Sequence, residues 1–453
     1  MDEFVVVGYG VQKKSHITGS VAKVKNVKLD QEPVSRIDEA LVGKMAGVNI
    51  TNANGAVGQA PTIRIRGNSS VTTASDPLIV VDGVPVSSDF LTTIDMNDVE
   101  SFEVLKDAAS AAIYGSRAAA GVIMITTKQG KAGKTKFSFN AYSGIKSAVS
   151  TESPVPTVSE WASWVRQQNG GPTSEVTRIE AIGTEQNWAE TMFDGGNIQS
   201  YNLRASGGND KINFMASGGY MKDEGVLLTD DFEKYNLRLN LNAKVNDVVS
   251  VGFSAAPSYS NTRRFPIGVH DAIRQSPWLP IYHDAHTLQY VVNPDFDPSV
   301  GDYAMERHFT TTDSEDPNYY FPTTSNANAY AKVVERNYQD RLFNLLTSGY
   351  LKLNLMEGLE FKSSIAVEYQ HLNTEDWDGV LADRRGASRA GSSLATRSRT
   401  HWVNENYFTY NKTIAKHDVN LVAGFSAEKT NVFSSNLDGS GYSFDYIRLL
   451  KSH

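Results

Sequence analysis

The sequence of 453 residues contains no cysteine, and this absence excludes disulfide scaffolds and thiolate metal sites. It also contains no run of about eighteen or more apolar residues, which excludes a membrane-spanning helix. A transmembrane β-barrel remains allowed, because its strands need only alternating segments of about ten residues. The mean hydropathy of -0.35 is therefore compatible with a barrel.

The chain also lacks basic blocks and catalytic motifs. Its net charge of -8 argues against nucleic-acid binding. Residues 133–135 (Gly-Lys-Thr) end like a phosphate-binding loop, but Lys128 stands where the first glycine belongs. No zinc-protease histidine motif occurs, and the scattered carboxylates define no glycosidase pair. The sequence therefore predicts no catalytic residue, no metal site and no cofactor, and we expect a protein that is not an enzyme.

What the chain does contain is a strict alternation of apolar and polar side chains over residues 234–245. Successive side chains of a strand point to opposite faces. Leu237 and Leu239 therefore share one face, while Asn236 and Arg238 share the other. At helical spacing the charged residues would fall among the leucines, so the pattern predicts a strand.

The same alternation recurs along most of the remaining chain. The further segments are residues 137–145, 201–207, 211–221, 249–257, 343–355, 359–369, 402–410 and 419–427. Tight turns such as 246–247 (Asn-Asp) and 357–358 (Glu-Gly) alternate with long connections at about 146–200, 260–338 and 372–401. Short turns at one end and long loops at the other are typical of an outer-membrane barrel. We therefore favour a membrane barrel over a soluble β-sandwich.

The first 130 residues have a different pattern. Residues 63–67, 77–84 and 122–127 read as short apolar strands. Asp107 is expected to cap a short helix over the alanine-rich residues that follow, and Gly115 is expected to end it. These elements predict a compact α/β domain ahead of the first barrel strand.

Four stretches of this domain carry a family resemblance. They are residues 5–10 (VVVGYG), 63–67 (IRIRG), 77–85 (PLIVVDGVP) and 99–119 (VESFEVLKDAASAAIYGSRAA). In this order they resemble the plug domain of TonB-dependent outer-membrane transporters, specifically the SusC/RagA family. Ala120 and Met124 depart from the family's usual Asn and Ile.

The resemblance implies a membrane β-barrel of about 22 antiparallel strands with an N-terminal α/β plug domain inside it. It divides the chain into a TonB-box segment and linker (1–15), a plug (16–133) and the N-terminal part of the barrel with long extracellular loops (134–453). Far fewer strands than that are recognisable here. We expect an N-terminal piece of a longer transporter rather than a chain completed by another polypeptide, and the absent signal peptide agrees with this.

In this arrangement the leucines of residues 234–245 should face lipid. Asn236, Arg238, Asn240 and Asn242 should face the lumen and touch plug or water. The Asn-Asp turn at 246–247 should be periplasmic. Asp82, which precedes a glycine, is expected to be a turn former with a structural role.

The resemblance also identifies a TonB box at the start of the chain. Its residues are Asp2, Glu3, Phe4, Val5, Val6, Val7 and Gly8. An extended valine-rich segment can add as a strand to the sheet edge of a partner. Without the resemblance, a disordered tail or an ordinary plug strand would be the simpler interpretation. The implied partners are TonB with ExbB and ExbD, powered by the proton-motive force.

The long loops and the upper loop of the plug are the candidate ligand surface. The residues selected are Asn68, Ser69, Ser70, Trp278, Tyr282, Tyr319, Tyr320, Trp377, Asp376 and Asp378. Aromatic rings can stack on sugars, and the two aspartates can bond hydroxyl groups or a cation. Membrane girdles and loop packing also use aromatic residues, so packing is the simpler role for each one.

The expected function is TonB-dependent active import of oligosaccharides, or of oligopeptides, across the bacterial outer membrane. A SusD-like surface lipoprotein would act as a lid, and the resemblance allows a dimer of transporter–lipoprotein pairs. The alternative is an outer-membrane receptor or adhesin barrel that does not transport. A glycoside hydrolase is the weakest option.

Overall fold

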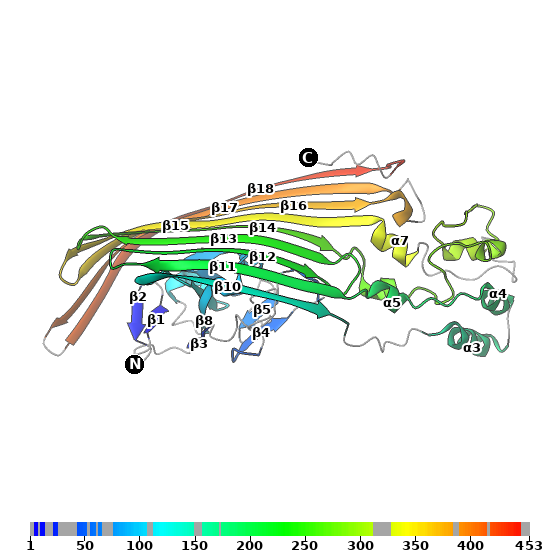
Figure 1. Ribbon diagram of the computed structural model, residues 1–453, viewed down its shortest axis with the longest axis horizontal. Coiled ribbons are helices and arrows are strands. Elements are labelled where there is room, and N and C mark those ends of the chain that lie inside the picture. The colour runs from blue at the N-terminus through cyan, green and yellow to red at the C-terminus, as the bar shows by residue number, and fades with distance from the viewer. Residues whose placement is uncertain are drawn as a thin grey trace.

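The computed structural model describes residues 4–7, 10–13, 21–25, 43–51, 55–59, 62–65, 76–106, 112–148, 156–171, 174–310, 328–383, 389–414 and 417–444. It consists of a long curved sheet and a smaller α/β part packed against one face of that sheet (Figure 1). We call the sheet the wall and the smaller part, from residue 21 to residue 127, the plug.

The wall is a nine-stranded antiparallel sheet in which every strand pairs with its neighbours in the sequence. Its strands are β10 (Gly133–Lys146), β11 (Gly196–Gly208), β12 (Ile212–Glu224), β13 (Asp231–Lys244), β14 (Val249–Arg264), β15 (Arg336–Met356), β16 (Leu359–Asp378), β17 (Gly391–Ile414) and β18 (His417–Ser440). Such an up-and-down order is the arrangement that barrels use.

Strand β13 confirms the predicted alternation. Leu237 is 58% exposed on the outer face, whereas Arg238 is 3% exposed on the face toward the plug. Asn236 and Asn240 are buried beside Arg238. The strand ends at a tight turn, where Asn246 accepts hydrogen bonds from the backbone N–H groups of Val248 and Val249 at 2.9 and 2.7 Å.

The strands on the C-terminal side of the wall are longer than the sequence pattern predicts. The expected loop at 372–401 consists largely of strand, because β16 continues to Asp378 and β17 begins at Gly391. Charged pairs such as Arg336 with Asp378, at 2.8 Å, line this extension. Strands with polar residues on both faces show no apolar alternation, so their ends could not be read from the pattern.

The plug contains a five-stranded sheet in the order β3-β8-β9-β6-β7. These strands are β3 (Val21–Lys25), β6 (Leu78–Val81), β7 (Val84–Val86), β8 (Val99–Leu105) and β9 (Val122–Thr127). The β6–β9 pair is parallel and the others are antiparallel. Two separate hairpins are formed by β1 (Phe4–Val7) with β2 (Gly10–Lys13), and by β4 (Val48–Thr51) with β5 (Thr62–Ile65).

Short 3-10 helices connect the plug strands. They are η3 (Ser88–Thr92), η4 (Met96–Asp98) and η5 (Ala112–Ala118). The first residues of the helix predicted after Asp107 lie outside the described residues. Residues 112–118 form the 3-10 helix η5, which is kinked at Gly115 and does not end there as predicted. Val81, Phe102 and Ile125 are among the fully buried residues of the plug core.

The long connections carry their own helices at one end of the wall, opposite the short turns (Figure 1). These helices are α3 (Val158–Asn169), α4 (Ser174–Ile182), α5 (Trp188–Met192), α6 (Val269–Ile273) and α7 (Ala329–Val334). Helix α3 begins with a capping box between Thr157 and Glu160 and ends at Gly170, whose φ of 71° suits glycine. Among the described residues, no helix combines the length and apolar character needed to cross a membrane.

Candidate functional site

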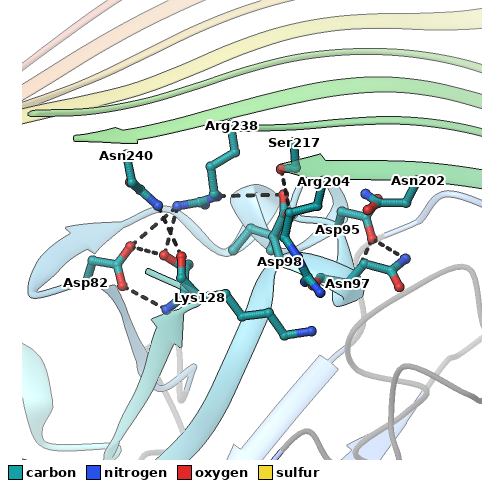
Figure 2. Close-up of polar contacts among 12 residues, drawn as sticks. Asp82, Asp95, Asn97, Asp98, Lys128, Asn202, Arg204, Ser217, Arg238 and Asn240 are labelled. Carbon is teal, nitrogen blue, oxygen red and sulfur yellow. Dashed lines mark hydrogen bonds and ion pairs between the residues drawn. The ribbon is translucent and has the colours of Figure 1, made fainter. Parts of the chain in front are cut away.

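The plug is held to the wall by polar side chains of β13, and Arg238 stands at the centre of them (Figure 2). Its guanidinium donates to Thr127 Oγ1 at 3.1 Å and to Asp82 Oδ2 at 3.4 Å. It also lies 3.8 Å from Asp98 Oδ2. One wall residue thus contacts the end of β9, the turn after β6 and the end of η4.

Asp82 has a second role besides the expected turn. Its φ of 49° and the φ of 89° at Gly83 confirm a tight turn between β6 and β7. Its carboxylate also accepts hydrogen bonds from the backbone N–H and the hydroxyl of Thr127, at 2.8 and 2.6 Å. The residue therefore fastens β9 to the turn and presents a negative charge to Arg238.

Helix η4 supplies the second half of the interface. Asp95 accepts a hydrogen bond from the Asn202 amide at 3.0 Å, and Asp98 accepts one from the Ser217 hydroxyl at 2.7 Å (Figure 2). The pKa of Asp98 is raised to about 6 by burial, and the nearby charge of Asp95 adds to this. Asp98 therefore titrates close to neutral pH.

Lys234 is a buried cation on the same strand. Its side chain is 2% exposed, and its ammonium donates to the carbonyl oxygens of Thr92 and Ile94 at 3.3 and 3.2 Å. Burying a lysine is costly unless it is hydrogen-bonded. These carbonyl groups, at the end of η3, satisfy it and join a third plug element to β13.

A separate contact joins the upper part of the plug to the connection between β12 and β13. The Val57 N–H donates to Asp230 Oδ2 at 3.2 Å. Gly58 has a φ of +69°, and a Cβ there would lie 2.3 Å from the Phe232 ring. Only glycine fits this close approach. Burial raises the pKa of Asp230 to about 6, so its charge is also sensitive to pH near neutrality.

Next to this contact a cavity of about 290 Å³ lies between the plug and strands β14 to β17. The plug lines it with Gly58, Gln59, Asp89 and Thr92. The wall lines it with Ser260, Thr262, Asp340, Leu342, Gln370, Leu372, Arg397 and Arg399. No metal-binding group of histidines and carboxylates is present in the described part of the chain.

The structure buries both tryptophans that were selected as ligand candidates. Trp278 is 1% exposed and meets Phe309 edge to face, with ring centroids 5.6 Å apart, in the core of the loop helices. Trp377 is 2% exposed and packs against Tyr442. Both side chains therefore pack within the protein, as the simpler interpretation of loop aromatics expects.

The other candidates differ in their surroundings. Tyr282 is 45% exposed and stacks on Tyr303 with centroids 5.0 Å apart. Asp376 and Asp378 belong to β16 rather than to a loop, and they pair with Arg264 at 2.5 Å and Arg336 at 2.8 Å. Asn68, Ser69, Ser70, Tyr319 and Tyr320 lie outside the described residues.

The predicted TonB box includes β1, which the structure describes from Phe4 to Val7. The strand is extended and pairs with β2, with Phe4 opposite Lys13. Asp2, Glu3 and Gly8 lie outside the described residues.

None of the cavity residues is among the ligand candidates named from the sequence. Arg397 and Arg399 alternate with neutral residues on β17. In a barrel strand this alternation indicates charged side chains that face the lumen, and it could have pointed to the wall side of the cavity. The plug residues that line the cavity, such as Asp89, show no such alternation in the sequence.

Comparison with known proteins shows that the chain is similar to TonB-dependent receptors. The family model "TonB-dependent Receptor Plug Domain" matches residues 13–122. "TonB-dependent receptor P26" of Formosa agariphila is 29% identical over 449 residues, which are 95% of this chain and 42% of that protein. "TonB-dependent receptor SusC" of Bacteroides thetaiotaomicron is 28% identical, over 93% of this chain and 40% of that protein. The chain thus spans about two fifths of the length of these relatives.

A solved structure supports the architecture. The RagAB peptide importer in its "open-open" state superposes with a TM-score of 0.78, at 24% identity, over 99% of this chain and 51% of the other. At this identity the likeness is evidence for the fold alone. The predicted fold is confirmed: an α/β plug packs against an antiparallel wall that is part of a barrel.

Proposed function

We propose that this chain comprises the plug and part of the barrel of a SusC/RagA-like TonB-dependent receptor, and that the whole protein imports oligomeric nutrients across the bacterial outer membrane. The ligands would be oligosaccharides or oligopeptides, moved without chemical change. We retain the proposed division into a TonB segment (1–15), a plug (16–133) and a barrel region (134–453).

The observation that supports import most directly is the set of polar contacts that β13 makes with η3, η4 and β9 of the plug. Side chains of β13 hold η3, η4 and the end of β9 through hydrogen bonds and ion pairs. Each typical hydrogen bond contributes about 0.5–1.5 kcal/mol net, because water replaces it when it breaks. Such an interface can therefore release part of the plug into water without exposing a large apolar surface.

The contact with TonB, which would drive import, would be made by residues 2–8. An extended strand such as β1 can join the sheet edge of TonB, with backbone hydrogen bonds supplying affinity. Leaving β2 would free the β1 backbone for this pairing. TonB, with ExbB and ExbD, would then pull on the plug using the proton-motive force.

The outer end of the wall would meet a SusD-like lipoprotein acting as a lid. Trp164 on α3 and Leu381 between β16 and β17 are large apolar side chains that stay more than half exposed there. Exposed apolar groups of this kind are suited to a protein partner. A dimer of transporter–lipoprotein pairs is part of the same proposal.

The test is deletion of residues 2–8 in the full-length protein, followed by whole-cell uptake and surface-binding assays with a labelled ligand. Import predicts that uptake is lost while binding is retained. A receptor or adhesin barrel that does not transport needs no TonB contact. Undiminished accumulation after the deletion would therefore reject the import proposal.

A further inference from the structure

The cavity between plug and wall contains charged groups of two kinds: paired and unpaired. The guanidinium of Arg399 is paired with Glu368, and Asp340 is held by Arg264 at 3.0 Å. Glu368 also accepts a hydrogen bond from the Ser87 hydroxyl at 2.8 Å. These groups are already neutralised by partners within the protein.

Two opposite charges in the cavity have no such partner among the described residues. Within the part of the chain that the structure describes, no hydrogen bond or ion pair holds the Asp89 carboxylate or the Arg397 guanidinium. Both side chains are exposed to the cavity space. Asp89 belongs to η3 of the plug and Arg397 belongs to β17 of the wall, so the two charges come from the two separate parts of the protein.

The rest of the lining that the structure describes is polar or aliphatic and contains no aromatic ring. Its volume of about 290 Å³ corresponds to roughly ten water molecules at about 30 Å³ each. The space therefore fits a short segment of an oligomer. Neutral sugars would find no ring to stack on, whereas a carboxylate would find a guanidinium, which binds it with two parallel hydrogen bonds.

We propose that this cavity recognises an oligopeptide with free termini, whose carboxylate binds Arg397 and whose ammonium group binds Asp89. This proposal rests on the proposed import function and narrows its substrate class. Because one charge belongs to the plug and the other to the wall, the bound peptide would connect the two parts. Ligand occupancy would then be sensed directly by η3, the plug element whose end is also held by Lys234.

The test is isothermal titration of the full-length receptor with three tetraalanine probes. The first probe has free termini, the second is acetylated at its N-terminus and the third is amidated at its C-terminus. R397Q should weaken binding of the free and acetylated peptides by about tenfold or more, with little effect on the amidated one. D89N should weaken binding of the free and amidated peptides, with little effect on the acetylated one. K412Q, on β17 but outside the cavity, is the control and should change nothing.

This pattern separates recognition from misfolding, because a folding defect would weaken all three probes equally. Equal weakening, or no weakening, of all three probes by both variants would overturn the proposal. Tighter binding of the neutral sugar maltotetraose than of the free peptide would also overturn it. The import function would survive either outcome, since it fails only if uptake is independent of residues 2–8.

Discussion

Replacing Arg238 with methionine should loosen the plug. The variant keeps most of the buried volume but removes the cation that faces Asp82 and Asp98. Removing one partner of a buried ion pair costs about 3–5 kcal/mol, because the other charge is left without compensation. Asp98 can take up a proton near pH 6, so we expect the lower end, about 3 kcal/mol.

The effect can be measured by hydrogen exchange in the full-length protein. The Thr127 N–H is a suitable reporter, because it is bonded to Asp82 at 2.8 Å and lies next to Arg238. A loss of about 3 kcal/mol raises its exchange rate by about two orders of magnitude, at tenfold for each 1.4 kcal/mol. K222M is the matched control, since Lys222 makes an exposed pair with Glu224 that is worth at most about 1 kcal/mol. An R238M exchange rate within tenfold of that of K222M would show that Arg238 does not hold the plug in place.

Three further predictions concern single side chains. Asp98 has a pKa of about 6, above its usual value, so plug docking should weaken as the pH rises from about 4 to 6. Hydrogen exchange of the plug should therefore show weaker docking at pH 8 than at pH 5. D98N should remove this difference between the two pH values. G58A should detach residues 55–59 from Phe232. G43A is its control for backbone strain alone, since Gly43 has a φ of +72° and no described neighbour within 4 Å of an added Cβ. Limited proteolysis should therefore cleave residues 55–59 faster in G58A than in G43A. His308 bonds His283 at 2.7 Å and its pKa is lowered to about 4 by burial, so the folded loop keeps it neutral. The loop should therefore lose stability as the pH falls from about 6.5 to 4, and H308Q should flatten that dependence in a pH series of thermal melts.

Much of the wall could be predicted from the sequence, because its strands and turns are specified by residues that are neighbours in the chain. A strand with lipid on one face and polar groups on the other must alternate, as Leu237 and Arg238 do. The turn at Asn246 follows from the backbone preferences of the residues themselves. Where β16 and β17 extend beyond the region of alternation, that local signal ends, and the predicted loop at 372–401 was largely wrong.

The plug–wall contacts could not be predicted, because they join residues far apart in the sequence. Asp82 could be identified as a turn former, but its pairing with Arg238 depends on how β6 and β13 are placed in space. The buried positions of Trp278 and Trp377 are likewise set by tertiary packing. A single sequence contains both side chains of each such contact but does not show which side chains pair with one another.

The claim that the plug must move is tested most directly by tethering it to the wall. The chain has no cysteine, so a pair can be introduced at Asn97 and Asn140, whose side chains are hydrogen-bonded at 2.7 Å across the plug–wall boundary. Full-length N97C/N140C would be joined with a short bifunctional thiol reagent, and each single-cysteine variant would be treated alike. If import requires movement of the plug, the tether will abolish whole-cell uptake while surface binding persists. Uptake at the rate of the single-cysteine controls would contradict it.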